Sequence, residues 1–205
     1  MKGLHGMGIQ LAIKRLLDVV ICFMILVIGF PIYLIIAILV RLSSPGPIFF
    51  VQDRVGLNGR IFQMYKFRTM MGAPDESIIV WSQSDEDRIT KVGRFLRDYG
   101  LDELPQAVNI LRGDMSIVGP RPPLPNQVEN YSDHQKGIFK MRPGVFSLAA
   151  IKGRRSIPME ERIELHVQYV ENWSLGLDAK ILWKGLLVVL GREDVSETVV
   201  EEREV

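Results

Sequence analysis

An uninterrupted apolar segment near the N-terminus constrains this chain more than any other feature. Residues 19–40 are 22 consecutive uncharged positions, nearly all of them Val, Ile, Leu, Phe or Met. As a helix this segment would measure about 33 Å, which is enough to cross the hydrocarbon core of a bilayer. A buried helix of a soluble domain is the alternative, but so long a run is uncommon in 205 residues. The segment is also too long for a cleaved signal peptide, so it predicts a membrane anchor.

Pro31 and the flanking charges indicate how this anchor lies in the membrane. Proline removes an intrahelical hydrogen bond and clashes with the preceding turn, so with Gly29 nearby we expect a sharp kink. Basic residues stand on both sides of the segment: Lys2, Lys14 and Arg15 before it, and Arg41, Arg54, Arg60, Lys66 and Arg68 after it. Because positive charges draw both ends to the cytoplasm, residues 1–43 are predicted to form a re-entrant, monotopic anchor. An ordinary spanning helix that tolerates its proline remains the alternative.

The composition excludes several classes of protein. A chain with 47% apolar residues can form a core, which excludes a wholly disordered protein. The single cysteine, Cys22, cannot close an internal disulfide, and no Cys/His cluster has the spacing of a zinc site. Residues 1–53, 54–155 and 156–205 carry net charges of +2, +5 and −6. The basic middle part favours an anionic ligand, with a solvated charged surface as the alternative.

After the anchor we expect an α+β, mainly helical domain over residues 44–192. Alternation predicts a β-hairpin with strands at 48–52 and 60–69. This alternation places Lys66 and Arg68 side by side on one face of the second strand. An anion between them would relieve their repulsion, whereas solvation of both side chains is the simpler explanation.

Two further helices are expected in this domain. Acidic residues at 85–87 suit the N-terminus of a helix that runs to Tyr99. A second helix near 178–190, N-capped by Asp178, has the pattern of an amphipathic helix in the headgroup plane. A core helix with two snorkelling lysines is the alternative for that segment. Residues 193–205 are predicted to form an acidic tail.

Asp102 and Glu103 are the leading candidates for chemistry. Asp102 can N-cap a helix that ends near Gly113, so plain capping would explain both acids without any reaction. Cationic residues on both sides favour a functional role, because a carboxylate whose pKa they lower can attack phosphorus while a metal ion screens the charge. The glycine- and proline-rich loop at 113–123 carries Arg121, and arginine is a natural bidentate partner of phosphate.

Six motifs follow one another between residue 14 and about residue 190. They are Lys14-Arg15-Leu16-Leu17-Asp18, Ser44-Pro45-Gly46-Pro47-Ile48-Phe49-Phe50-Val51-Gln52-Asp53-Arg54, Tyr65-Lys66-Phe67-Arg68-Thr69-Met70, Leu101-Asp102-Glu103-Leu104-Pro105-Gln106, Gly113-Asp114-Met115-Ser116-Ile117-Val118-Gly119-Pro120-Arg121-Pro122 and Tyr169-Val170-Glu171-Asn172-Trp173-Ser174. In this order they resemble the bacterial sugar transferase family. These are monotopic polyprenyl-phosphate phosphoglycosyl transferases, which begin the assembly of O-antigen, capsule and glycoprotein glycans.

The resemblance implies a magnesium-dependent enzyme that transfers a sugar 1-phosphate from a UDP-sugar to a polyprenyl phosphate. Asp102 would attack the phosphate nearer the sugar, which releases UMP and leaves a phosphosugar-aspartyl intermediate for the lipid phosphate to attack. Glu103 would hold Mg²⁺ together with Asp102 or assist the acceptor. The cations expected to bind substrate phosphates are Arg97, Arg121, Lys66, Arg68 and Arg154.

The resemblance also implies a location and partners. The catalytic domain would lie on the cytoplasmic face of the bacterial inner membrane, where a soluble nucleotide sugar meets a lipid-borne phosphate. A nucleic-acid partner is not expected, since the basic groups belong to no recognisable binding module. Assembly into a homo-oligomer is left open.

Two single residues and one ten-residue stretch depart from the family pattern. Phe30 stands where a serine usually precedes the proline of the anchor, but Pro31 alone supplies the kink. Residues 145–154 replace a stretch that typically reads Ile-Thr-Gly-Trp-Ala-Gln-Val-Asn-Gly-Arg, and His166 stands where an aspartate is common. These changes point to an unusual donor sugar.

Two other functions compete with the transferase. One is a catalytically idle membrane scaffold of the same fold, which the altered segment at 145–152 favours. The other is a membrane-bound UDP-sugar hydrolase, in which water intercepts the covalent intermediate. The intact Asp102-Glu103 pair favours an enzyme over the scaffold.

The re-entrant anchor predicts that the N-terminus lies inside the cell. A cysteine introduced by Lys2→Cys should therefore resist membrane-impermeant thiol reagents applied to intact cells, and should react after the cells are opened. Labelling from outside intact cells would contradict the re-entrant model and favour the spanning helix.

Overall fold

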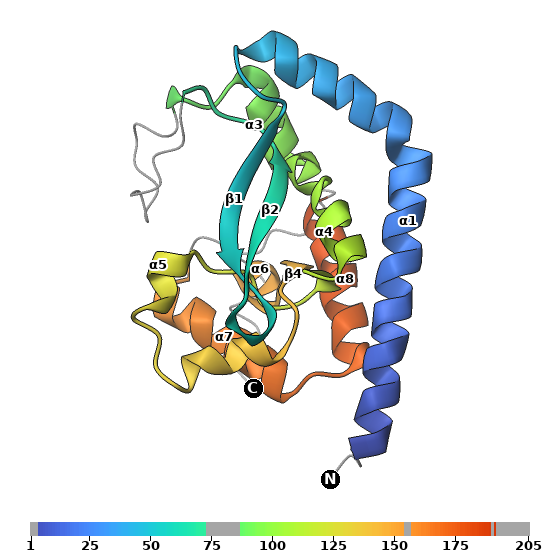
Figure 1. Cartoon of the computed structure of the whole chain (residues 1–205), viewed down its shortest axis with the longest axis vertical. Helices are drawn as coiled ribbons and strands as arrows, with labels where there is room; N and C mark the ends of the chain where they lie inside the picture. Colours follow the sequence, from blue (N-terminus) through green and yellow to red (C-terminus); the bar gives the residue numbers. More distant parts are fainter. Residues whose placement is uncertain (1–3, 73–86, 154–156, 190, 192–205) are drawn as a thin grey trace.

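The computed structural model describes residues 4–72, 87–153, 157–189 and 191, and it is mainly helical with a small antiparallel strand pair, as expected (Figure 1). The elements in chain order are α1 Leu4–Ser43, β1 Phe49–Val55, η1 Leu57–Gly59, β2 Ile61–Phe67, α3 Lys91–Asp98, η2 Leu101–Glu103, α4 Gln106–Arg112, β3 Ser116–Val118, α5 Pro125–Val128, η3 Gln135–Lys140, β4 Gly144–Phe146, α6 Leu148–Lys152, α7 Met159–Glu171 and α8 Leu175–Val189. Arg154 and the tail 193–205 lie outside the described residues.

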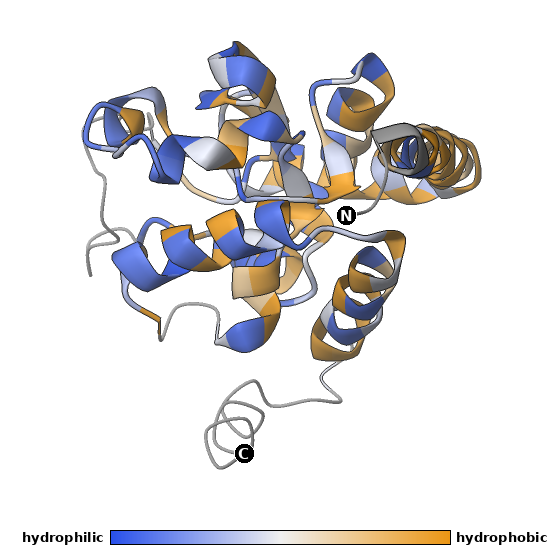
Figure 2. Ribbon diagram, turned by 90° about the horizontal axis from the view of Figure 1, so that it is seen from below, coloured by the Kyte–Doolittle hydropathy of each residue, from blue (hydrophilic) through white to orange (hydrophobic). Residues whose placement is uncertain are grey.

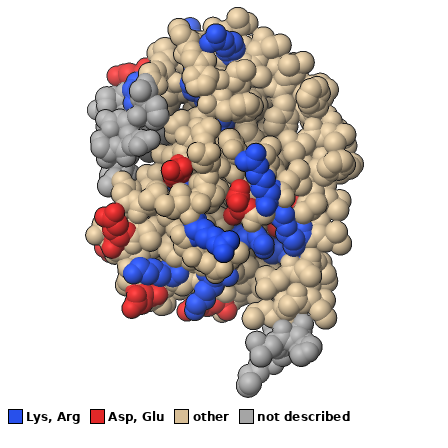
Figure 3. Space-filling model, viewed as in Figure 1, with Lys and Arg blue, Asp and Glu red and all other residues tan. Residues whose placement is uncertain are grey.

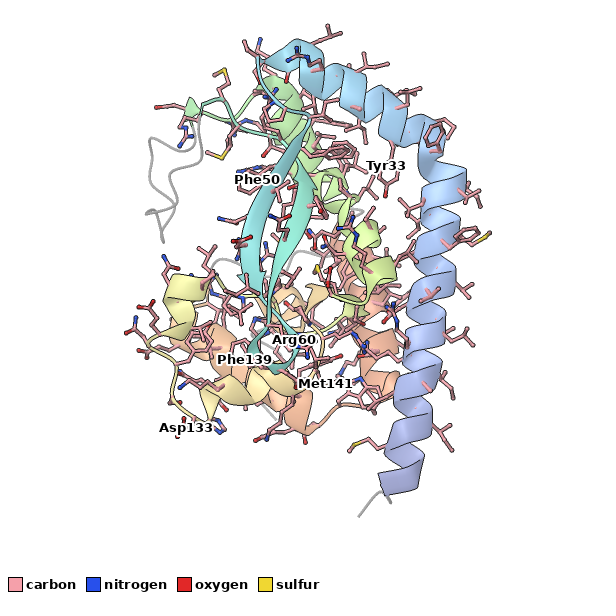
Figure 4. All side chains as sticks on the ribbon, viewed as in Figure 1. Tyr33, Phe50, Arg60, Asp133, Phe139 and Met141 are labelled. Atoms are coloured by element: carbon pink, nitrogen blue, oxygen red, sulfur yellow. The ribbon has the colours of Figure 1, made fainter. Side chains whose placement is uncertain are left out.

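Helix α1 is the apolar segment predicted to be the anchor. It contains Pro31 and remains helical through it, but it bends next to Tyr33 (Figure 4). A bend is expected because proline cannot donate the intrahelical hydrogen bond of its turn. The part from Met7 to Ser43 is long and apolar enough to cross a membrane by length and composition.

The outward side of α1 exposes a continuous apolar surface. Viewed from below in Figure 2, the helix is strongly hydrophobic, and the edge it forms carries almost no charge in Figure 3. The exposed side chains on this helix include Val20, Phe23, Met24, Val27, Ile28, Phe30, Ile32, Leu34, Ile35, Ile38, Leu39 and Leu42. So large an exposed apolar surface is typical of contact with lipid.

The other side of α1 is fastened to the rest of the chain near both ends. Towards its N-terminus, Lys14 donates to the carboxylate of Asp178 at 2.6 Å and to the carbonyl of Val118 at 2.9 Å. At its C-terminus, Arg68 donates to the carbonyl of Ser44 at 2.7 Å. The folded domain therefore lies along α1 between these two contacts, and the N-terminal end of the helix extends beyond the domain in Figure 1.

The predicted hairpin is confirmed, with a first strand that runs three residues further than expected. Strands β1 and β2 pair antiparallel from Phe49↔Phe67 to Val55↔Ile61. The turn between them contains Asn58 at φ 56°, a left-handed conformation that asparagine tolerates. Phe67 is buried between β1 and α1, which anchors the neighbouring Lys66.

A short parallel pair holds the loop that follows β3. Ser116 pairs with Gly144 and Val118 with Phe146. A Cβ on Gly144 would collide with the backbone nitrogen of Gly119. The two backbone segments therefore approach more closely than a side chain at this position would allow. This contact fixes the start of the proline-rich segment that leads to Arg121.

The starts of two helices differ from the sequence predictions, and the predicted start of a third lies mostly outside the described residues. Residues 85 and 86 of that start are not described, and α3 itself begins at Lys91 with Thr90 as its N-cap. Asp102 caps no helix and lies in the short turn η2. Asp178 does not cap α8 but lies inside it and binds Lys14. The hydroxyl of Ser174 instead accepts a hydrogen bond from the backbone N–H of Leu177 in the first turn.

Breaking the buried Lys14–Asp178 ion pair should destabilise the fold. Lys14→Met would leave the buried Asp178 carboxylate without its cation, so we expect a loss of about 3–5 kcal/mol in the free energy of unfolding. Unfolding in detergent micelles measures this loss. Lys180→Met, at an exposed position on the same helix as Asp178, is the matched control and should change little. Equal losses in the two variants would contradict the role of the pair.

Candidate active site

The Asp-Glu pair lies at the junction between α3 and α4. Gly100 ends the first helix in a left-handed conformation at φ 64°, which glycine adopts without strain, and turn η2 follows immediately. Asp102 is 9% exposed. The turn thus presents two adjacent carboxyl groups in a largely buried setting.

Glu103 is held by two cations from distant parts of the chain. Its carboxylate accepts from Nζ of Lys66 on β2 at 2.6 Å and lies 3.5 Å from the guanidinium of Arg121. Burial alone would raise the pKa of Glu103, but Lys66 and Arg121 outweigh it and lower the pKa to about 2. Glu103 is therefore ionised throughout the physiological range.

Asp102 has the opposite electrostatic balance. Burial raises its pKa and the neighbouring Glu103 adds to this, while Lys66 and Arg97 act against the rise. The sequence-based expectation that nearby cations lower this pKa is therefore wrong, because burial is the larger effect. A carboxyl group of higher pKa is the better nucleophile once it has lost its proton, and two neighbouring groups shifted in opposite directions suit two different roles.

A small hollow opens beside Glu103. Its lining comes from β1, β2, η2, α4, the segment after β3 and the start of β4, and consists of Arg54, Met64, Lys66, Glu103, Gln106, Arg121, Pro122 and Gly144. Three of these side chains are cationic and one is acidic. The hollow therefore suits an anionic ligand.

Arg54 is a site residue that sequence reasoning missed, since its charge was considered only for membrane topology. Its guanidinium donates to the carbonyl of Pro122 at 3.0 Å and to the side chain of Gln52 at 2.6 Å. Burial and Arg121 lower its pKa to about 10 against the opposing effect of Glu103, so Arg54 stays protonated at neutral pH. The hairpin register was the missing signal, because Arg54 pairs with Phe62 and so shares a face with Lys66.

Comparison with known proteins identifies the family. Residues 9–192 match the family model described as bacterial sugar transferase. The chain belongs to this family.

Named relatives extend the comparison. The uncharacterized sugar transferase EpsL of Bacillus subtilis is 41% identical over 91% of this chain and 91% of its own length. The UDP-glucose:undecaprenyl-phosphate glucose-1-phosphate transferase of Klebsiella pneumoniae is 40% identical over 86% of this chain, which spans only 40% of that protein. The Caulobacter vibrioides protein with the same name is 41% identical over 82% of this chain and 66% of its own length.

In the structure of this sugar transferase, some of the predicted phosphate-binding cations lie beside the Asp102-Glu103 dyad and others do not. Lys66, Arg121 and Arg97 surround the two carboxyl groups, and Arg97 also donates to the hydroxyl of Thr69 at 2.8 Å. Arg68 instead donates to the carbonyls of Val40, Ser44 and Pro45 at the end of α1. The described contacts of Arg68 are thus with backbone carbonyls, whereas Lys66 contacts Glu103.

A magnesium ion at this site would take its protein ligands from the Asp-Glu pair. Mg²⁺ commonly takes one or two protein carboxylates, with phosphate oxygens and water as its remaining ligands. Within the described ranges no group of three or more His, Cys, Asp or Glu side chains could enclose an ion by itself. Asp102 and Glu103 would supply the carboxylate ligands, and the substrate the others.

His166 should make the protein less stable below neutral pH. Burial, together with Arg121 and Arg162, lowers its pKa from 6.5 to about 4. Below pH 6.5 His166 binds a proton in the unfolded chain, whereas in the folded chain it stays neutral until about pH 4. The free energy of unfolding therefore falls by about 3 kcal/mol as the pH drops across this window. Unfolding free energies of His166→Gln measured from pH 7 to 4 should lack this fall.

The exposed His134 supplies the matched control. His134→Gln should keep the fall in stability that His166→Gln loses. Parallel pH profiles for the wild type and both variants would contradict the assignment to His166.

Proposed function

We propose that this protein transfers a sugar 1-phosphate from a UDP-sugar to undecaprenyl phosphate on the cytoplasmic face of the bacterial inner membrane, as the first step of glycan assembly. The observation that carries the proposal is the Asp102-Glu103 pair beside a cationic hollow, in a domain fastened along an apolar helix. The names of relatives support it. One is the Klebsiella pneumoniae enzyme named above, and another is the undecaprenyl-phosphate galactose phosphotransferase of Salmonella typhimurium, 36% identical over 88% of this chain and 41% of its own length.

The first half of the reaction is a displacement at the phosphorus next to the sugar. A carboxylate oxygen of Asp102 forms the new bond to phosphorus, and the bond from that phosphorus to the bridging oxygen of the diphosphate breaks. UMP leaves with the bonding electrons, and the sugar phosphate remains on Asp102 as an acyl phosphate. Burial keeps water from the carboxyl group that must react.

The second half returns the enzyme to its starting state. An oxygen of the lipid phosphate attacks the same phosphorus, and the bond between phosphorus and Asp102 breaks. The product is a sugar linked through a diphosphate to the polyprenol. Glu103 stays ionised through both halves, because Lys66 and Arg121 stabilise its charge.

The cations of the hollow neutralise phosphate charge in both displacements. Phosphoryl transfer depends mainly on positioning and on charge neutralisation, which Lys66, Arg97 and Arg121 provide near the dyad. A magnesium ion held by Asp102 and Glu103 would add a Lewis acid for the phosphate oxygens. The magnesium requirement is part of the proposal.

The attachment of α1 supports a re-entrant anchor. If α1 crossed the bilayer, Lys14 and Ser44 would lie on opposite faces of the membrane. Both are held by one folded domain, through Asp178 and Arg68. A helix that enters and leaves on the same side satisfies both contacts without placing the polar domain in hydrocarbon.

Exposed apolar side chains outside α1 support contact with the same membrane surface. Phe95 and Tyr99 at the end of α3 are more than half exposed and touch each other, with ring centroids 4.9 Å apart. On α8, Trp183 and Leu186 are also exposed. Aromatic residues of this kind favour the headgroup region of a bilayer.

Asp102→Asn should abolish the covalent intermediate. With purified protein in lipid, Mg²⁺ and a panel of UDP-sugars but no lipid acceptor, the wild type should release about one equivalent of UMP and gain the mass of a sugar phosphate. Because an amide oxygen is a poor nucleophile, the variant should lose at least about a thousandfold in rate and show no adduct. UMP release and intact mass are the two measurements.

Asp98→Asn is the matched control for this experiment, since Asp98 is exposed and only four residues from Asp102. It should behave as the wild type. Continuous UMP release without acceptor would favour the hydrolase, and no release with any donor would favour the scaffold.

A further inference from the structure

Two side chains that line the hollow each carry a donor without a hydrogen-bond partner among the described residues. Gln106 is 2% exposed, and its Nε2 is buried without a hydrogen bond to any described residue. Nε of Arg54 is also buried and has no such partner. Both side chains line the hollow beside Glu103. Because buried donors in folded proteins are nearly always satisfied, two unpaired donors on side chains that line one hollow indicate a ligand.

The Arg54 side chain is held in place by its other two nitrogens. One donates to the carbonyl of Pro122 and the other to Gln52, so the guanidinium is fixed before any ligand arrives. Such a group loses little conformational freedom on binding. The remaining Nε is thus a preorganised donor.

The charge of the hollow determines the kind of ligand. Arg54, Lys66 and Arg121 are cationic, and Glu103 is the acidic member of the lining. Glu103 pairs with Lys66 and Arg121, whereas the ion pairs within the described part of the chain include none for Arg54. The lining thus holds three cations and one carboxylate, which favours an anion with several acceptor oxygens.

The geometry points to Arg54 and Gln106 as a pair of donors that binds a phosphate oxygen of the substrates. Arg54 supplies charge through Nε, and Gln106 supplies an uncharged hydrogen bond from its amide. This inference rests on the proposed function, in which phosphate reaches the site from both the nucleotide sugar and the lipid. The two sources share one chemistry, and the experiment below distinguishes them.

Two substitutions remove the donors with little change in size or charge. Gln106→Leu keeps the approximate size and removes the amide. Arg54→Lys keeps the charge and removes Nε together with the guanidinium bonds to Pro122 and Gln52. The matched controls are Gln168→Leu and Arg60→Lys, because both of these positions are exposed. Binding of UMP is measured by calorimetry on the full chain in lipid, and KM for undecaprenyl phosphate is measured in the complete reaction.

We expect each variant to weaken one of these interactions roughly tenfold, as the loss of one hydrogen bond to a charged group would. Weaker UMP binding would assign the donors to the nucleotide phosphate, and a higher KM for undecaprenyl phosphate would assign them to the lipid phosphate. The controls should change neither. Gln106→Leu should also melt no lower than the wild type, since the amide has no partner to lose.

Unchanged UMP binding and unchanged KM in both variants would overturn the inference. So would a lower melting temperature for Gln106→Leu without any change in either constant, because that result assigns the amide a structural role. Since UMP binding needs no turnover, this measurement remains readable if the wild type transfers no sugar phosphate. Failure of transfer by the wild type would instead contradict the proposed function.

Discussion

A buried lysine on the apolar helix holds the folded domain to its anchor. The carboxylate of Asp178 accepts hydrogen bonds from Lys14, from the hydroxyl of Tyr169 at 2.7 Å and from the indole of Trp173 at 3.1 Å. These donors come from α1, from α7 and from the connection between α7 and α8. A paired charge in such a setting is tolerated, whereas either partner alone would be costly. Together with the contacts of Arg68 at the far end of α1, this network fixes the position of the site relative to the membrane helix.

The site depends on a second balance, between burial and charge at two adjacent carboxyl groups. Glu103 is close enough to Lys66 and Arg121 for their charges to outweigh burial, and its pKa falls. At Asp102 the same burial outweighs the cations, and the pKa rises. Two adjacent carboxyl groups thus have pKa values shifted in opposite directions. This difference follows from the turn η2, which directs the two side chains into different surroundings.

The parts of the fold that follow from local pattern could be predicted, and those that depend on distant contacts could not. The hairpin follows from alternation, and Gly113 ends α4 as expected at φ 94°. Asp178 was misread as a helix cap because its partner Lys14 lies 164 residues away. The dyad itself was found through its family motif and its cationic surroundings. Arg54 was missed because its place in the site requires the register of two strands, which no single strand reveals.

The contact between Gly119 and Gly144 limits how this site can evolve. A side chain at either position would meet backbone atoms, and no change in a neighbouring side chain can make room for it. The route of the chain into Arg121 is therefore closed to gradual substitution at these two points.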